Sequence, residues 1–323
     1  MKSITTGLAL AALMLSVCTP SHAAWPTDRP INYIVPFSPG GGTDIIARVV
    51  ADKLSILLST PVVVTNKPGA GGNIGTEYVA RSAADGYTIG GASIATHAIN
   101  TSLYKQIGFD PQKDFTPISL VGTTPNVLIV NPKTPYHSVN DLVMAIRKSA
   151  DPMPFASAGA GTSQHLSGEL FAQTESVKLL HIPYKGAGPA LTAVMAGEVP
   201  FSFENLIVAS PQIKSGAVRA LAVTSSEREP SFPDLPTMQQ SGVPGYDVVS
   251  WQAIFAPSGL DSAIRDRLSK AIQKIFQRPD VIDRMTALGV NIVASTPEQL
   301  AKFQDKEIDR WATVIKNGKV TLD

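Results

Sequence analysis

Three glycine-rich turns are the segments of this chain best suited to chemistry. Each follows a short apolar run and precedes an amphipathic stretch, so each is expected to join a strand to a helix; they span residues 36–44, 66–75 and 157–165. Glycine lets the backbone turn with its N–H groups facing outward and lets a ligand approach closely. The helix behind adds unpaired N–H groups and the positive end of its dipole. Such turns can hold an anion without a positively charged side chain.

The sequences of these turns favour a carboxylate over a phosphate as that anion. The dinucleotide pattern G-x-G-x-x-G is missing from the first turn, and the pattern G-x-x-x-x-G-K-[ST] is found nowhere. Gly69-Ala70-Gly71 and Gly159-Ala160-Gly161 begin correctly and lack the third glycine. The alternative is that all three turns are tight connections that simply need positive φ angles. Three turns at one edge of a sheet favour the ligand-binding interpretation.

The ionisable side chains give little sign of catalysis. Asp44 can be a general base, but a first-turn acid more often favours the helix dipole and organises its loop. The histidines at 97, 137, 165 and 181 show no short metal-ligand spacing, and no G-x-S-x-G motif is present. His165 either holds a ligand or bonds the backbone. No metal and no cofactor are expected.

Polar residues near the ends of predicted strands are candidates for ligand specificity. Lys185 either neutralises a second ligand carboxylate or is solvated, and Asn205 can both donate and accept hydrogen bonds. Glu204 would repel an anion if it faced the ligand. We expect specificity to depend on Ser93, Thr96, His97, Lys185 and Asn205.

Residues 1–23 have the pattern of a cleavable secretory signal. Lys2 supplies the positive start, Gly7 to Val17 is apolar, and Ser21-His22-Ala23 places small residues before the cut. Cleavage between Ala23 and Ala24 would release a soluble exported protein, because the apolar stretch is shorter than the roughly 20 residues of a spanning helix.

The composition excludes several classes of function. Cys18 is the sole cysteine and is lost with the signal; a lipidated Cys18 is the alternative, although Val17 is a poor residue before it. The mature chain then has no disulfide, thiolate metal site or cysteine nucleophile. Without Lys2 it has 26 basic and 26 acidic residues. With no basic run, it is not expected to bind nucleic acid.

Apolar runs alternate with amphipathic stretches along the mature chain, which indicates an α/β protein with parallel sheets covered on both faces. A mature length near 300 residues favours two domains. Residues 230–257, rich in proline and glycine, are predicted to be a long connection. Strands are expected at 31–35, 62–65, 87–91, 127–130, 179–183, 199–203 and 218–224. Helices are expected at 44–58, 138–148, 262–276, 281–288 and 296–317.

Several different motifs are spread along the chain, and their combination is far more specific than any single glycine turn. They are Pro36-Phe37-x-x-Gly40-Gly41-x-x-Asp44, Asn66-Lys-Pro-Gly-Ala-Gly-Gly72, Asp85-Gly86-Tyr87-Thr88, Asp114-Phe-Thr-Pro-Ile118, Gly161-Thr162-x-x-His165-Leu166, Pro183-Tyr-Lys-Gly186, Leu221-Ala-Val-Thr224 and Pro233-x-x-Pro236-Thr237. With these motifs the chain resembles the substrate receptors of tripartite tricarboxylate transporters, the Bug proteins, over essentially its whole mature length. Glu204 departs from the family pattern, in which an aspartate is common.

The resemblance implies a two-lobed, type II-like Venus flytrap of the periplasmic binding proteins, with lobes of residues 24–123 plus 248–323 and 124–247. It implies that the two glycine turns of the first lobe grip a mono-, di- or tricarboxylate, partly through water, and that the turn from Gly161 to Ser163 of the second lobe faces them across the cleft. The site residues expected from the turns and the resemblance are Phe37, Ser38, Gly40, Gly41, Asp44, Gly69, Ala70, Gly71, Gly72, Asn73, Ser93, Thr96, Gly161, Thr162, Ser163, His165, Lys185 and Asn205.

The expected function is that of a monomeric receptor that delivers a small organic acid to a membrane permease of the tripartite tricarboxylate type. A carboxylate sensor that presents its ligand state to a two-component kinase is an alternative with the same binding chemistry. A secreted enzyme using Asp44 and His165 is a weaker alternative, because no nucleophile or metal site accompanies them.

Overall fold

The computed structural model describes residues 25–318 and 320–321. The predicted signal sequence and Cys18 lie outside the described residues. Within the described part of the chain, no helix combines the length and the apolar character that a membrane crossing requires.

The strands form one ten-stranded sheet whose order along the main path is β2-β1-β3-β9-β4-β7-β5-β6, with β8 and β10 each paired to β4. Two groups of three strands are parallel, namely β2-β1-β3 and β6-β5-β7. The strands are β1 (Ile31–Val35), β2 (Val62–Asn66), β3 (Thr88–Ser93), β4 (Phe115–Val130), β5 (Met153–Ser157), β6 (Leu179–Pro183), β7 (Phe201–Asn205), β8 (Arg219–Val223), β9 (Val249–Pro257) and β10 (Asn291–Ile292).

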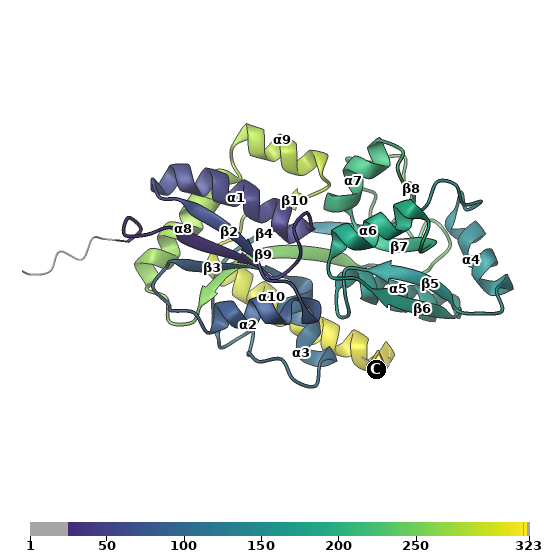
Figure 1. Cartoon of the computed structure of the whole chain (residues 1–323), viewed down its shortest axis with the longest axis horizontal. Coiled ribbons are helices and arrows are strands. Elements are labelled where there is room, and N and C mark those ends of the chain that lie inside the picture. The colour runs from purple at the N-terminus through teal and green to yellow at the C-terminus, as the bar shows by residue number, and fades with distance from the viewer. Residues whose placement is uncertain (1–24, 319, 322–323) are drawn as a thin grey trace, which may run out of the picture.

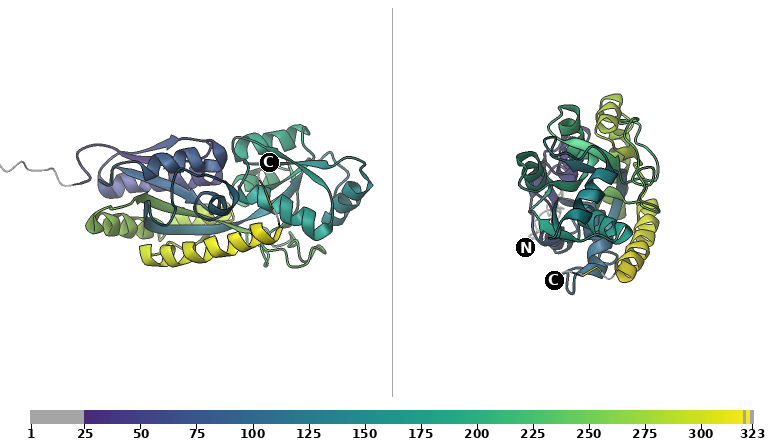
Figure 2. Two further views of the ribbon diagram at one scale, coloured as in Figure 1. Left: turned by 90° about the horizontal axis from the view of Figure 1, so that it is seen from below. Right: turned by 90° about the vertical axis from the view of Figure 1, so that its right-hand side faces the viewer.

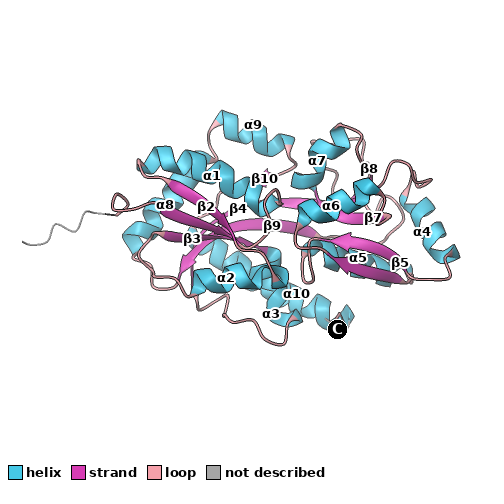
Figure 3. Cartoon of the chain, in the orientation of Figure 1, coloured by secondary structure: helices cyan, strands magenta, loops and turns pink. Residues whose placement is uncertain are grey.

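Helices cover the sheet in two groups, and the molecule is elongated as a result. Figure 1 shows α1, α2, α8 and α9 around β1–β3 at one end and α4–α7 around β5–β7 at the other. Figure 3 shows the strands running through the middle between the helices. The helices are α1 (Gly42–Leu58), α2 (Asn73–Ala80), α3 (Asn100–Leu103), α4 (Val139–Lys148), α5 (Ser163–Glu175), α6 (Ala187–Ala196), α7 (Leu206–Lys214), α8 (Ser262–Ile275), α9 (Pro279–Ala287) and α10 (Pro297–Gly318), with the short turns η1 (Ala70–Gly72) and η2 (Ala95–Ile99).

We call the part built on β1–β3 the first half and the part built on β5–β8 the second half. Two antiparallel strands, β4 and β9, connect them. Residues 115–125 of β4 pair with β9, whereas residues 126–130 pair with β7 and β8. Helix α10 runs along one side of the molecule, as seen from below in Figure 2.

A threonine fixes the place where the chain crosses between the halves. The Thr224 hydroxyl accepts a hydrogen bond from the Asn126 backbone N–H at 2.8 Å and lies 2.6 Å from the Val248 carbonyl. Asn126 belongs to the outgoing strand β4, and Val248 immediately precedes the returning strand β9. The fully buried Thr224 side chain therefore ties both crossing segments together.

The predicted elements agree with the structure except where proline and glycine conceal a strand. The segment 230–257 is not a connection throughout, because it ends in β9, which lies in the middle of the sheet. Strand β4 is also much longer than the predicted 127–130. Pro117 and Pro125 lie within it, and the register shifts near Pro117. Proline cannot donate to a ladder and normally argues against a central strand, which explains why the length of β4 was underestimated. Strand β9 was missed because the proline- and glycine-rich residues before it indicated a connection.

Candidate functional site

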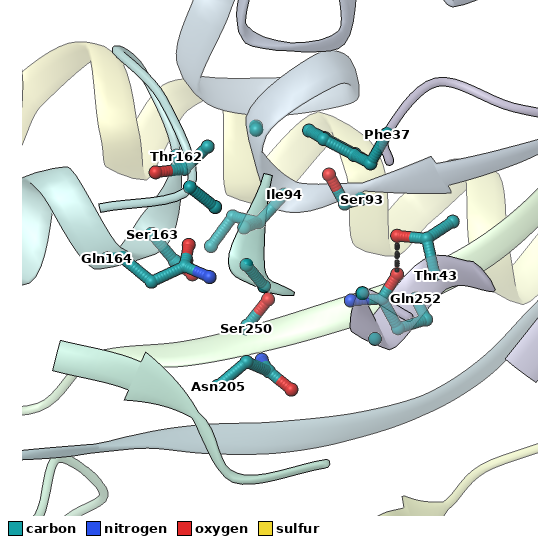
Figure 4. Close-up of a pocket in the computed structure, with 15 residues that line it drawn as sticks. Phe37, Thr43, Ser93, Ile94, Thr162, Ser163, Gln164, Asn205, Ser250 and Gln252 are labelled. Carbon is teal, nitrogen blue, oxygen red and sulfur yellow. Dashed lines mark hydrogen bonds between the residues drawn. The ribbon is translucent and has the colours of Figure 1, made fainter. Parts of the chain in front are cut away.

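A small cavity lies between the two halves, and residues from both halves line it (Figure 4). Among its fifteen described lining residues, none carries a charge. Its volume is about 40 Å³, and a single water needs roughly 10–15 Å³ on this measure. The lining residues are Phe37, Gly41, Gly42, Thr43, Ser93, Ile94, Ala95, Ala158, Thr162, Ser163, Gln164, Ala187, Asn205, Ser250 and Gln252.

Several helices begin at this cavity, so that their first turns lie beside it. Helix α1 of the first half begins there, and so do α5, α6 and α7 of the second half. The first N–H groups of a helix have no acceptor within it, and the dipole makes that end positive. The cavity therefore has a positive potential on two opposing sides, although its described lining contains no cationic side chain.

Local sequence explains why the second-half helices begin at the cavity. The side chains of Thr162 and Asn205 cap α5 and α7 by accepting hydrogen bonds from the backbone N–H groups of His165 and Ile207. Each capping residue follows a strand or a glycine turn, where the backbone is still extended. The caps leave the N–H groups of the first helical residues facing the cavity side.

Polar side chains complete the cavity wall. The Thr43 hydroxyl donates to the Gln252 side-chain oxygen at 2.7 Å, and Figure 4 shows this bond beside the cavity. Ser93 is 5% exposed, and its hydroxyl oxygen has no hydrogen-bond partner. A buried, unpaired hydroxyl costs free energy unless a ligand or water bonds it. Ser93 is thus a polar group available to a ligand.

Asp44 lies behind the first glycine turn rather than on the cavity wall. Its carboxylate accepts hydrogen bonds from Arg48 at 2.9 and 3.0 Å, from the Asn66 amide at 2.9 Å and from the Gly40 N–H at 2.9 Å. Burial opposes its ionisation, but the hydrogen bonds and the Arg48 charge outweigh burial and lower the Asp44 pKa. Asp44 is therefore ionised and holds the turn in place.

The second glycine turn lines a neighbouring cavity of about 240 Å³, which shares Phe37 and Ala158 with the first. Gly71 has a φ of +62°, and a Cβ there would lie 2.4 Å from the Ala160 carbonyl oxygen of the second half and 2.6 Å from the Tyr104 hydroxyl. A side chain at Gly71 cannot fit while the halves are together.

The two halves touch beside this second cavity. The Tyr104 hydroxyl of the first half donates to the Ala160 carbonyl at 3.0 Å. The Ser38 hydroxyl donates to the Lys185 carbonyl. The halves are therefore closed on each other, with the glycine turns of both halves meeting at the contact.

The predicted histidines do not form a catalytic or metal site. His165 accepts from the Gly161 N–H at 3.2 Å, and its ring stacks on His181 at 3.9 Å. His97 is buried and stacks on Phe255, and burial lowers the His97 pKa to about 3. No three His, Cys, Asp or Glu side chains of the described chain are grouped so as to hold a metal ion.

The structure distributes the predicted site residues over three places. Those that line the first cavity are Phe37, Gly41, Ser93, Thr162, Ser163 and Asn205. Those that line the second cavity, besides Phe37, are Gly69, Ala70, Gly71, Gly72 and Lys185. Those that line neither cavity are Ser38, Gly40, Asp44, Asn73, Thr96, Gly161 and His165, together with His97 from the specificity set.

Some residues that line the first cavity were missed by sequence reasoning. Gly42, Thr43 and Gln164 lie inside the predicted turns, so the turn pattern marked their place but not their side chains. Ser250 and Gln252 belong to β9, the strand predicted to be a connection. Ala158 lies inside the third predicted turn, and no local pattern marks the remaining three, Ile94, Ala95 and Ala187.

The fold is that of a periplasmic binding protein, an α/β class in which a ligand lies between two parts joined by crossing strands. Residues 46–320 match the model of the tripartite tricarboxylate transporter family receptor, and the chain belongs to that family. It is a family of solute-binding receptors, not of enzymes, so the enzyme alternative is wrong.

Individual relatives agree with this assignment. The chain is 40% identical to protein BugT of Bordetella pertussis over 91% of this chain and 90% of BugT. It is similar to the periplasmic binding protein BugD, with a TM-score of 0.88 and 38% identity over 91% of this chain and 99% of BugD.

Two similar structures contain carboxylic acids. R. palustris Rpa4515, solved with adipate, has a TM-score of 0.89 and 34% identity over 92% of this chain and 99% of its own. MatC from Rhodopseudomonas palustris, solved with bound malate, has a TM-score of 0.86 and 32% identity over 90% of this chain and 99% of its own.

Proposed function

We propose that this receptor captures a small organic acid in the first cavity and delivers it to a membrane permease of the tripartite tricarboxylate type. The family to which the chain belongs and the acids present in two relatives support this function. The mature protein begins at Ala24 and acts as a periplasmic monomer.

The observation that carries the proposal is the convergence of helix N-termini from both halves on a cavity without charged lining. Helix α1 approaches from the first half, and α5, α6 and α7 approach from the second. Preformed N–H groups bind a carboxylate without reorganising, and they attract negative charge without a competing salt bridge. An acid that contacts both sides stabilises the closed arrangement of the halves.

The predicted residues take different roles in this proposal. Gly41, Ser93, Thr162, Ser163 and Asn205, with Phe37 as an apolar wall, contact the acid. The second turn, from Gly69 to Asn73, and its contacts with Ala160 bring the halves together.

Asp44 shapes the first turn without touching the ligand, whereas Lys185 lines the second cavity. The lobes that close are residues 24–123 plus 248–323 and 124–247, because both crossings lie near the contacts of Thr224 with Asn126 and Val248.

A thermal-shift screen tests the binding claim. Malate, adipate, citrate and benzoate are added to the mature protein, with the corresponding amides as neutral controls. A ligand present at 100 times its Kd stabilises the folded state by about 2.7 kcal/mol. We expect at least one acid to raise the melting temperature and its amide to leave it unchanged; no shift with any acid would contradict the proposal.

Delivery to the permease needs a separate experiment. Cells lacking this gene are expected to lose uptake of the acid identified in the screen, and uptake should return with the wild-type gene. Normal uptake in the deletion strain, together with a loss of acid-dependent transcription, would favour the sensor alternative. Sequencing the N-terminus of the exported protein is expected to give Ala24.

A further inference from the structure

Glu204 is a buried acid directly behind the cavity wall. It is the penultimate residue of β7 and is 1% exposed. Its carboxyl oxygen accepts a hydrogen bond from the Asn205 backbone N–H at 2.7 Å and from the Gln164 side-chain amide at 3.3 Å. Both donors belong to residues that line the cavity. Glu204 is therefore one residue removed from any ligand there.

The elements around Glu204 supply no cation to pair with it. Strand β4 places Val127 opposite Glu204, and the described residues of β4, β5 and α6 include no titratable side chain. In α5, the ring of His165 faces His181 and Glu169. In α7, Lys214 is at the far end and donates to the Ala287 carbonyl.

The arginine of β8 is also engaged elsewhere. Arg219 donates to the carbonyl groups of Pro132, Thr134 and Tyr136. With no cation beside it, the Glu204 carboxylate has little to offset its loss of hydration. Burial raises the Glu204 pKa to about 8, an effect larger than the opposing effect of its two hydrogen bonds.

We propose that Glu204 is a specificity-determining residue that must be protonated for the cavity to accept an anion. This inference rests on the proposed function. In its neutral form, Glu204 leaves the positive potential of the helix N-termini uncancelled. In its ionised form, it places a full negative charge behind Gln164 and Asn205, next to the negatively charged ligand.

The proposal predicts that affinity for an acid depends on pH in one direction. Below pH 7, Glu204 is neutral and affinity is constant; above pH 8, ionisation opposes binding and affinity falls. A charge this near a buried ligand carboxylate weakens binding by about tenfold or more, even at a high effective dielectric constant. Anion binding near pH 8 is therefore accompanied by proton uptake.

Calorimetric titration from pH 7 to pH 9.5 tests this prediction with malate and adipate as probes, since both carboxyl groups of each acid are almost completely ionised throughout this range. Wild type is expected to lose at least about tenfold in affinity between pH 7 and pH 9.5. Glu204→Gln keeps an oxygen acceptor for Asn205 and Gln164 and should bind with equal affinity across the range. Glu198→Gln, an exposed acid in the same half, is the matched control and should follow wild type. A flat wild-type profile, or the same fall in Glu204→Gln, overturns the inference.

A ligand-free measurement separates this inference from the proposed function. If neither probe binds at any pH, the choice of acid fails, and melting temperatures still test Glu204. Its folded pKa lies above its unfolded value, so its stabilising contribution is present at low pH and is lost as pH rises toward 8. Wild type should therefore lose several degrees relative to Glu204→Gln between pH 5 and pH 9. A constant difference between the two proteins would show that Glu204 is not held neutral.

Discussion

Two buried carboxyl groups, Asp44 in the first half and Glu204 in the second, lie close to the same cavity in opposite charge states. Asp44 is 2% exposed and is neutralised by Arg48, whose side chain is 53% exposed and reaches in from solvent. Glu204 receives two hydrogen bonds and no cation. Burial alone favours the neutral acid, whereas hydrogen bonds plus a guanidinium favour the carboxylate.

The comparison shows how a site proposed to bind an anion can have acidic residues close to it. In the first half, the ionised Asp44 stabilises the first glycine turn, and Arg48 balances its charge on the side away from the cavity. The second half keeps Glu204 and the partly buried His181 uncharged. In both halves, the helix N-termini remain the source of positive potential at the cavity. Substitutions in each half test this difference between the two acids.

The largest effect is expected where the two halves meet. Gly71→Val should lower affinity for the acid by more than about 100-fold, because its side chain would collide with the Ala160 carbonyl and keep the halves apart. Gly216→Val is the matched control: Gly216 also has a positive φ, of 74°, but a Cβ there meets nothing within 4 Å. Calorimetry gives the affinity, and circular dichroism verifies folding. Equal losses in the two variants would assign the effect to backbone strain.

Removing the charge from Asp44 should weaken the hydrogen bonds that hold the first glycine turn. Asp44→Asn is expected to lower the free energy of unfolding at pH 7 by about 1–3 kcal/mol, the usual range for hydrogen bonds to a charged group. Since the folded pKa of Asp44 is lowered, its contribution is present above the unfolded value near 3.8 and is lost in more acidic solution. Urea denaturation at pH 7 and pH 3 measures both effects.

A variant of an exposed ion pair provides the control for Asp44. Glu77 pairs with Arg81 on the surface of α2. Glu77→Gln should change stability by at most about 0.5 kcal/mol. If Asp44→Asn changes the free energy of unfolding as little as Glu77→Gln does, then Asp44 does not stabilise the first turn.

The neutral His181 of the second half predicts a smaller, acid-dependent effect. Burial, reinforced by the neighbouring His165, lowers the His181 pKa to about 3. A histidine with a depressed pKa stabilises the fold above its unfolded value of 6.5, and this stability is lost as pH falls. After allowance for solvent screening, wild type should lose about 1 kcal/mol more than His181→Gln between pH 7 and pH 5. Identical acid sensitivity in chemical denaturation would contradict this neutral state.

The smallest effect is expected from a single cavity hydroxyl. Ser93→Ala should weaken acid binding by about three- to tenfold, the worth of one hydrogen bond, without loss of stability. Ser202→Ala is the matched control, because the Ser202 hydroxyl is also buried and unpaired but does not line the cavity. If both variants retain wild-type affinity in calorimetry, the acid does not contact Ser93.

The sequence predicted the fold class and the five helices for which it gave ranges, because the relevant signals are local; it gave no range for α2, α3, α5, α6 or α7. The helix predicted at 138–148 is capped by Ser138, whose side chain accepts from the Asp141 N–H, and the helix predicted at 296–317 begins at Pro297. The glycine turns also lie where strands end and helices begin. The antiparallel strand β9 was missed because residues 230–248 before it are rich in turn residues, and its own buried residues do not alternate.

The pairing of residues across the halves could not be predicted from local patterns. Gln252 lies 209 residues after Thr43 in the chain and reaches it only because β9 returns beside β3. The charge state of Glu204 depends on the absence of a cation among its described neighbours, which no segment alone reveals. Tertiary packing therefore decides the electrostatics of the site.

Calorimetric titration of the mature wild-type protein at pH 7 with malate and adipate, each compared with its diamide, tests the central claim most directly. The diamides preserve size and shape but remove the negative charge that the helix N-termini attract. We predict that at least one acid binds and that its diamide binds more than about 100-fold more weakly. Equal binding of an acid and its diamide would contradict this claim, as would a thermal-shift screen in which no acid binds.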